Sequence, residues 1–215
     1  MQFLSSLRTL CCVLLLSCCA LCGAQTPVSP QRAAQMVAAI TSTAASTHTL
    51  RADFVQTKSL RMLNHKLTAR GRVIFAAPAR LRWEYLSPTA YVLVIDGEKV
   101  TVRSGKNKHS IDTRQSQIFA QIAQIMSESV TGRSLADTRR FAVRLFDEGN
   151  TWTAELTPRN GALKRLFATV RLRFDAKRRV VTRVDLVEHN GDATVIEMQG
   201  VQVNQRLDAH AFQVD

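Results

Sequence analysis

Apolar and charged residues alternate with a period of two along most of the chain from Leu50 onward. The segment 80–85 is the clearest case, with large apolar side chains on one side (Leu81, Trp83 and Tyr85) and charged side chains on the other (Arg80, Arg82 and Glu84). Successive side chains of a β-strand point to opposite faces of a sheet, so the pattern predicts strands with one apolar face and one wetted, charged face. We expect about ten strands, at residues 50–56, 67–76, 80–85, 91–95, 99–103, 140–145, 152–156, 165–174, 180–186 and 193–203.

Short turn signals separate these strands, among them Asp96-Gly97, Asn160-Gly161 and Asn190-Gly191-Asp192. Short turns favour sequential antiparallel hairpins. The expected fold is therefore mainly β (α+β), an incomplete and strongly curved antiparallel β-barrel of about ten to eleven strands.

Two segments have helical spacing instead. Ser29-Pro30 is a good helix start, and apolar residues follow it at helical intervals over residues 30–45. A second amphipathic helix is expected over residues 114–127, where it interrupts the strands. Its apolar stripe consists of Ile118, Phe119, Ile122, Ile125 and Met126.

The N-terminus has the features of an export signal. The apolar run from Leu10 to Leu21 is shorter than the roughly 20 residues of a membrane span, and small residues follow it, so we expect a signal peptide of residues 1–24 cut after Ala24. All five cysteines lie inside this leader. The alternative is a lipobox at Leu15-Leu16-Ser17-Cys18, which would leave Cys18 acylated. Residues 25–215 are expected to form a single domain in the periplasm.

The net charge of +12 is dispersed along many strands rather than gathered in one basic run. Together with export, this argues against nucleic acid as a partner. A transient contact with an anionic membrane surface, an acidic protein partner and a merely solvated basic surface all remain open.

The sequence offers little for catalysis. The five histidines are isolated from other metal-ligand types, and no nucleophile elbow, phosphate-binding glycine loop or dinucleotide motif is present. We therefore expect no enzyme activity, no metal site and no cofactor.

The apolar residues exceed what one sheet layer needs, and two short helices would cover an open barrel only in part. An apolar cavity suited to acyl chains, with the helices as its lid, is one arrangement that fits these residues. On the pattern alone, an ordinary packed core is the favoured interpretation. The expected cavity wall consists of Phe54, Val73, Phe75, Leu81, Trp83, Tyr85, Val143, Leu145, Trp152 and Leu156.

The chain resembles the LolA family of periplasmic outer-membrane lipoprotein carriers over nearly all of residues 25–215. None of the matching motifs is specific by itself, but the order and spacing of all of them together are. The matching segments are ADFVQT (52–57), RGRVIFAAPARLRWEYLSP (70–88), DG (96–97), LTP (156–158), GALKRL (161–166) and LDAHAFQV (207–214).

The resemblance implies an incomplete β-barrel with helices as a lid over a hydrophobic cavity. It also implies a monomeric carrier that receives acylated lipoproteins from an inner-membrane ABC transporter complex and passes them to an outer-membrane lipoprotein acceptor, without a cofactor. One position departs from the family. Familiar LolA proteins have Lys-Arg-Pro where this chain has Ala76-Ala77-Pro78, so the arginine that the family associates with lid closure is replaced by Ala77. Arg80, Arg70 or another group would have to take over that role, or the lid is less tightly latched.

Three other interpretations remain. The cargo could be another lipid-like molecule, such as a glycolipid or pigment precursor. Acylation at Cys18 would instead make the protein an outer-membrane-anchored acceptor. A regulatory sensor module would require a further domain or a membrane tether, and we expect neither.

Overall fold

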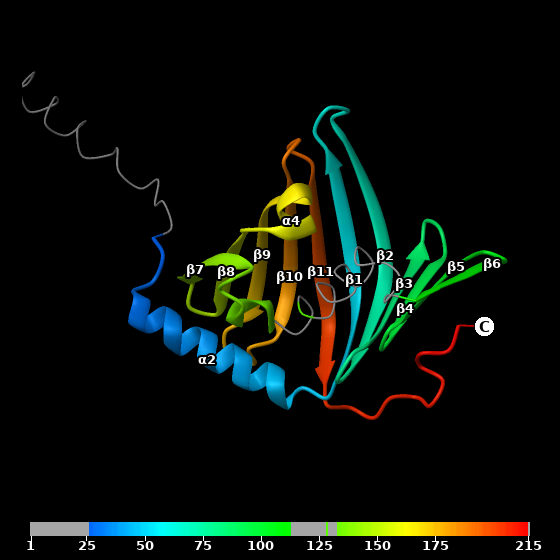
Figure 1. The fold of residues 1–215 in the computed structure, drawn as a ribbon, viewed down its shortest axis with the longest axis horizontal. Coiled ribbons are helices and arrows are strands. Elements are labelled where there is room, and N and C mark those ends of the chain that lie inside the picture. Colours follow the sequence, from blue (N-terminus) through cyan, green and yellow to red (C-terminus); the bar gives the residue numbers. More distant parts are fainter. Residues whose placement is uncertain (1–25, 113–127, 129–132, 215) are drawn as a thin grey trace, which may run out of the picture.

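The computed structural model describes residues 26–112, 128 and 133–214. Most of them lie in β-strands (Figure 1). The elements are α2 (Pro30–Ser46), β1 (Thr49–Leu60), β2 (His65–Ala76), β3 (Arg80–Ser87), β4 (Tyr91–Asp96), β5 (Lys99–Ser104), β6 (Asn107–Asp112), the 3₁₀ turn η2 (Arg133–Ala136), β7 (Phe141–Asp147), β8 (Thr151–Pro158), α4 (Gly161–Leu166), β9 (Phe167–Asp175), β10 (Val181–Glu188) and β11 (Ala193–Val203).

All eleven strands form one antiparallel sheet in the order β6-β5-β4-β3-β2-β1-β11-β10-β9-β8-β7. Strands β1 to β6 pair in sequence order, as do β7 to β11, and β1 pairs with β11 in the middle of the sheet. The edge strands β6 and β7 do not pair with each other, so the sheet stays open (Figure 1). The expected open antiparallel architecture of ten to eleven strands is confirmed.

Two details differ from the expectation. The strand β6 was not predicted, because its sequence NKHSID is almost entirely polar. As an edge strand it needs only the backbone pairing with β5. Residues 165 and 166 were expected in a strand, but they end the short helix α4, and β9 begins at Phe167.

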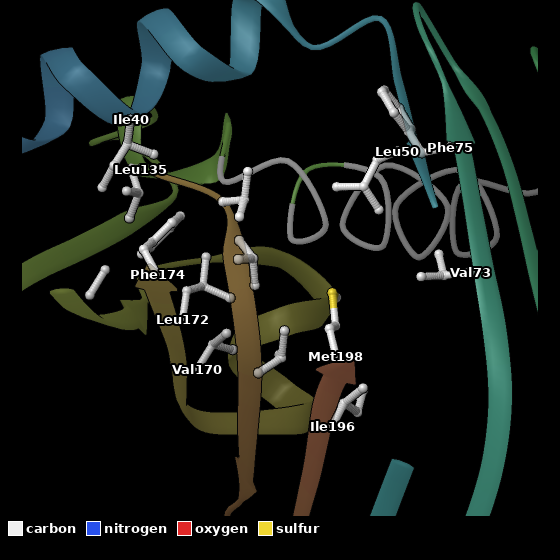
Figure 2. Packing of buried hydrophobic residues seen from close by; sticks show 14 of the residues in the cluster. Ile40, Leu50, Val73, Phe75, Leu135, Val170, Leu172, Phe174, Ile196 and Met198 are labelled. Carbon is white, nitrogen blue, oxygen red and sulfur yellow. The ribbon is translucent and has the colours of Figure 1, made fainter. Parts of the chain in front are cut away.

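The helix α2 follows the prediction closely. The Ser29 hydroxyl accepts a hydrogen bond from the Arg32 backbone N–H at 3.3 Å, and proline occupies the first turn. Met36, Ile40 and Ala44 are its buried residues. The helix lies across one end of the sheet (Figure 1), and Ile40 lies beside Leu135 of η2 (Figure 2).

One face of the sheet, called the inner face here, carries the apolar side of the alternation. Its buried residues belong to a single cluster that also includes α2 and η2 residues. Figure 2 shows part of that cluster, with side chains from β9, β10 and β11 gathered beneath Ile40 and Leu135. The sheet thus supplies one continuous apolar surface rather than several small ones.

The opposite, outer face carries rows of paired charges. Arg144, Glu155 and Arg171 lie directly opposite one another on β7, β8 and β9. The Nε atoms of the two arginines lie 3.2 and 2.8 Å from the Glu155 carboxylate oxygens. The predicted charged face is therefore present.

Within the described residues, no helix combines the length and the apolarity that a membrane span requires. The expected leader of residues 1–24, including Cys18, and the expected helix over 114–127 lie outside the described residues.

Candidate functional site

An aromatic cluster on the inner face extends from β1 across β2 to β3. The ring centroids of Phe54 and Trp83 are 4.4 Å apart, and Tyr85 meets Phe54 edge-on at 5.4 Å. The Tyr85 hydroxyl donates to the Gln56 side chain at 2.9 Å. Burial raises the pKa of Tyr85 above its usual range, so this hydroxyl stays protonated.

The cluster depends on Gly71 of β2, which lies opposite Phe54 in register. A Cβ atom at Gly71 would lie 2.3 Å from the Phe54 ring and 2.1 Å from the carbonyl oxygen of Glu84. The Phe54 ring therefore occupies the space that any side chain at position 71 would need. The period-two pattern did not single out Gly71, although it lies within the matching segment 70–88.

Trp83 contributes the polar atom that matters most on this surface. Its indole Nε1 is buried and forms no hydrogen bond of normal geometry with the described residues, although its contact with the Tyr85 hydroxyl partly offsets the rise in the pKa of that group. Such a weakly satisfied N–H can donate to an acceptor brought to the inner face. The aromatic cluster therefore carries a donor that a bound acceptor can engage.

The ten residues predicted as cavity wall all lie on the inner face. Eight are buried, and Tyr85 and Val143 are half-buried. They fall into two groups, one on β1–β3 and one on β7–β8, at opposite sides of the sheet. Strands β9, β10 and β11 lie between the groups and join them through residues that the predicted set left out, namely Val170, Leu172, Val184, Ile196 and Met198. The same alternation marks those residues in the sequence, so the signal to include them was present.

The predicted lid residues Ile118, Phe119, Ile122, Ile125 and Met126 lie outside the described residues. One neighbouring residue that the sequence did not indicate is Leu135 of η2, which is buried against the inner-face cluster. Leu135 has no large apolar neighbour within the short turn RSLA, so it gave no periodic signal.

Ala77 lies in the turn between β2 and β3, partly buried against the core. Its backbone N–H donates to the His48 carbonyl at 2.8 Å, and its methyl group offers no hydrogen bond. Arg70 and Arg80, considered as substitutes for the family arginine, alternate with inner-face residues and therefore point to the outer face. Arg80 lies over the Phe212 ring, 4.8 Å from its centroid.

The outer face of β3 is less wetted than the alternation predicted. Arg82 and Glu84 pair at 3.1 Å, and their side chains are only 15% and 20% exposed. The C-terminal segment (residues 204–214) covers part of this face, since Arg82 donates to the Gln213 carbonyl at 2.7 Å. The expectation of a fully wetted outer face at Arg82 and Glu84 is therefore wrong, because local alternation cannot show that a distant segment returns there.

The same C-terminal segment borders a pocket of about 240 Å³ on the outer side of the sheet. Arg51, Arg72, Arg206 and Asp208 are among its lining residues, so it differs in chemistry from the inner face. Across the described part of the chain, no three His, Cys, Asp or Glu side chains converge as metal ligands.

An open, eleven-stranded antiparallel sheet with one continuous apolar face defines a class of LolA-like half-barrels. The chain belongs to the LolA family, whose model, described as outer membrane lipoprotein carrier protein LolA, matches residues 45–215.

Two relatives are named outer-membrane lipoprotein carrier protein. The one from Coxiella burnetii strain CbuK_Q154 is 26% identical over 146 residues, which cover 66% of this chain and 65% of that protein. The one from Nitrosospira multiformis is 26% identical over 164 residues, which cover 76% of each chain. This chain thus spans about two thirds of the length of the Coxiella relative.

Solved structures also share the fold. A crystal structure of MucB superposes with a TM-score of 0.55 at 13% identity, covering 88% of this chain and 65% of that one. The Pseudomonas aeruginosa MucA/MucB complex gives a TM-score of 0.50 at 11% identity, covering 86% and 61%. At this identity the likeness concerns the fold alone.

Proposed function

We propose that this protein is a periplasmic carrier that holds the acyl chains of lipoproteins against its inner face and moves them from the inner to the outer membrane. Membership of the LolA family and the names of the two relatives support the cargo class. In this proposal the protein receives cargo from an inner-membrane ABC transporter complex and delivers it to an outer-membrane acceptor. It breaks no covalent bond.

The observation that carries the proposal is the continuous apolar inner face. Buried side chains from β1, β2, β3, β7, β8, β9, β10 and β11 belong to one cluster on one side of an open sheet. Acyl chains need a surface of this kind, because their binding is apolar and non-directional.

For binding to be reversible, the cargo must displace contacts within the protein as well as form new contacts with it. Burial of an acyl chain contributes about 0.8 kcal/mol per CH₂ group, so several long chains placed in an empty cavity would be held too firmly for release. We propose that the stripe Ile118, Phe119, Ile122, Ile125 and Met126 covers the inner face without cargo and gives way to acyl chains. Met126 suits such a surface because methionine adapts its shape.

The buried donor of Trp83 gives this binding an orientation. Acyl groups of lipoproteins end in an ester or amide carbonyl, which accepts hydrogen bonds. In the proposed complex, Trp83 Nε1 donates to such a carbonyl, and the aromatic rings of Phe54 and Tyr85 pack against the first methylene groups.

The direct test is to express the chain with its leader, purify it from the periplasm and record native mass spectra. Bound lipoproteins are the expected result. Bound glycolipids or pigment precursors would replace the proposed cargo with the alternative. A protein that carries nothing and binds no acyl probe would refute both. The intact mass shows whether the chain begins after Ala24 or carries an acyl group at Cys18, as an anchored acceptor would.

A matched pair of variants on β7 tests the face. Val143 and Ala142 are neighbours, both half-buried, and point to opposite faces. Val143→Asp places a charge on the inner face and should abolish acyl binding, whereas Ala142→Asp should leave it within about twofold, because a charge on the outer face does not meet an inner-face cargo. Equal binding by both variants would remove the inner face from the proposal.

A further inference from the structure

Five large apolar side chains in the described part of the chain are at least half exposed, and all lie at one end of the sheet. The values are 95% for Met62, 68% for Leu63, 50% for Leu67, 53% for Leu86 and 50% for Leu166. Met62 and Leu63 form the turn between β1 and β2, and Leu67 lies near the start of β2. Leu86 lies at the end of β3, and Leu166 ends α4 just before β9. Because neighbouring strands run in opposite directions, these positions lie at the same end of the sheet, where Figure 1 shows α4 and the β1–β2 hairpin.

The β1–β2 hairpin projects beyond β3 at this end, and its turn lies beyond the last pair with β11. Pairing between β2 and β3 begins only at Arg70 and Ser87, so residues 65–69 extend past β3. Five residues of strand measure about 16 Å. On the other side, pairing of β1 with β11 ends at Ser59 and Ala193. The turn that carries Met62 and Leu63 is therefore the outermost part of this hairpin.

Positive charges flank the exposed apolar pair. Arg61 and Lys66 lie within the same hairpin, and Lys164 and Arg165 lie in α4. Two acidic groups lie at this end of the sheet: Glu188 pairs with Lys58 at 3.2 Å, and Asp192 accepts from the Arg61 backbone N–H at 2.9 Å. Among the residues that the structure describes, neither Arg61 nor Lys66 forms an ion pair through its side chain.

A narrow projection of apolar residues between cations matches the chemistry of an anionic bilayer surface. Apolar side chains of interfacial segments enter the boundary between headgroups and acyl chains, while basic side chains contact anionic headgroups. A stable protein interface needs a broad complementary surface, whereas here the two most exposed residues lie on a single turn. We propose that the tip of the β1–β2 hairpin docks this protein on anionic lipid bilayers, with Met62 and Leu63 inserted and Arg61 and Lys66 on the headgroups.

Docking through this tip would orient the inner face relative to the bilayer. Leu67 alternates with Val73 and Phe75 along β2, so the inner face reaches the tip through it. A protein docked through this tip presents that end of the inner face to the bilayer. The inference is independent of the proposed cargo and is tested without any cargo.

The test is flotation with vesicles of phosphatidylethanolamine and phosphatidylglycerol, with phosphatidylcholine vesicles as the neutral comparison. The protein is the processed form from the periplasm, and its intact mass establishes that neither a leader nor an acyl group supplies the binding. The expected result is salt-sensitive binding to the anionic vesicles, weakened at least tenfold by the double change Met62→Ser and Leu63→Ser. Both side chains are exposed, so the urea midpoint should not change.

A matched pair of charge reversals separates a local contact from general attraction. Lys66→Glu should weaken binding about fivefold or more. Lys177→Glu makes the same charge change in the β9–β10 turn at the other end of the sheet and should alter binding less than about twofold. Leu63→Trp adds an exposed indole to two buried ones, and its fluorescence should shift to the blue when anionic vesicles are added.

Four outcomes overturn the proposal: no binding of the unaltered protein to anionic vesicles, equal binding by the double variant, equal effects of the two charge reversals, or no fluorescence shift. If the double variant bound protein-free vesicles normally but lost binding to membranes that contain proteins, the tip would be a site for a protein partner. That result would also overturn the proposal.

Discussion

Gly71 leaves room on β2 for the Phe54 ring of the aromatic cluster. Phe54 lies across it, and the Glu84 carbonyl approaches from β3. Glycine in a strand interior is normally unfavourable because it adds entropy to the unfolded chain. Here the close contact of the Phe54 ring with its neighbours offsets that cost.

Gly71→Ala should therefore destabilise the protein by about 3 kcal/mol, because the new methyl group must displace both an aromatic ring and a backbone carbonyl. Urea denaturation gives this free energy. Adding Phe54→Leu should recover only part of the loss, since the clash with the Glu84 carbonyl remains. A Gly71→Ala variant as stable as the parent would contradict the packing described for this position.

Trp83 makes a second residue-level prediction. Trp83→Phe keeps an aromatic ring but removes the Nε1 donor, and a neutral hydrogen bond contributes about 1 kcal/mol. Affinity for a long-chain acyl ester should fall about fivefold, while affinity for a hydrocarbon of the same length should change little. Calorimetric titration with both probes checks this. Equal losses for the two probes would mean that Trp83 acts only by packing.

At the scale of elements, charge rows connect the strands of the outer face. Glu155 is buried between Arg144 and Arg171, which are themselves partly exposed. Burial raises the pKa of Glu155, but hydrogen bonds and charges from the two arginines outweigh it and hold the pKa below its ordinary value of 4.5. The row therefore stabilises the pairing of β7, β8 and β9 only while Glu155 is ionised.

The sign of this contribution sets its pH range. Because the folded-state pKa is lowered, the stabilisation is complete above about pH 4.5 and is lost as the pH falls through the lower value. Glu155→Gln should cost about 2 kcal/mol at neutral pH and flatten the acid side of the stability curve. Glu197→Gln, which alters a more exposed pair with Arg183, should cost less than about 1 kcal/mol. An unchanged pH profile in Glu155→Gln would exclude this role.

Much of the fold follows from local pattern. Alternation placed ten of the eleven strands and assigned the predicted wall residues to the inner face, because side-chain direction in a strand depends only on position along it. It missed β6, whose polar sequence alternates with nothing, and α4, whose six residues are too short for a helical period. Burial of Arg82 and Glu84 was missed as well, since it depends on a segment about 130 residues away.

At the scale of the whole molecule, the chain crosses from one edge of the sheet to the other. Strand β6 ends at Asp112 on one edge and β7 begins at Phe141 on the opposite edge. Among the described strands, β6 and β7 are the two edges, and the sheet does not close into a barrel.

If cargo binds the inner face, its binding free energy adds to the stability of the folded sheet. A ligand that binds only the folded sheet stabilises it by about 2.7 kcal/mol when present at one hundred times its Kd. A soluble acyl ester should therefore raise the urea midpoint of the parent protein and of Ala142→Asp, but not that of Val143→Asp. Stabilisation of all three to the same extent would place the ligand away from the inner face.

The sequence by itself determined the class of secondary structure, the direction of nearly every strand side chain and the family, because each rests on local spacing or on ordered motifs. Only the tertiary structure decided that β1 pairs with β11 and that the two predicted wall groups are joined across β9–β11. It also decided that the five exposed apolar residues lie at one end of the sheet. These features arise from contacts between segments far apart in the chain. Period-two alternation is the same whichever neighbour a strand pairs with, so it cannot encode that choice.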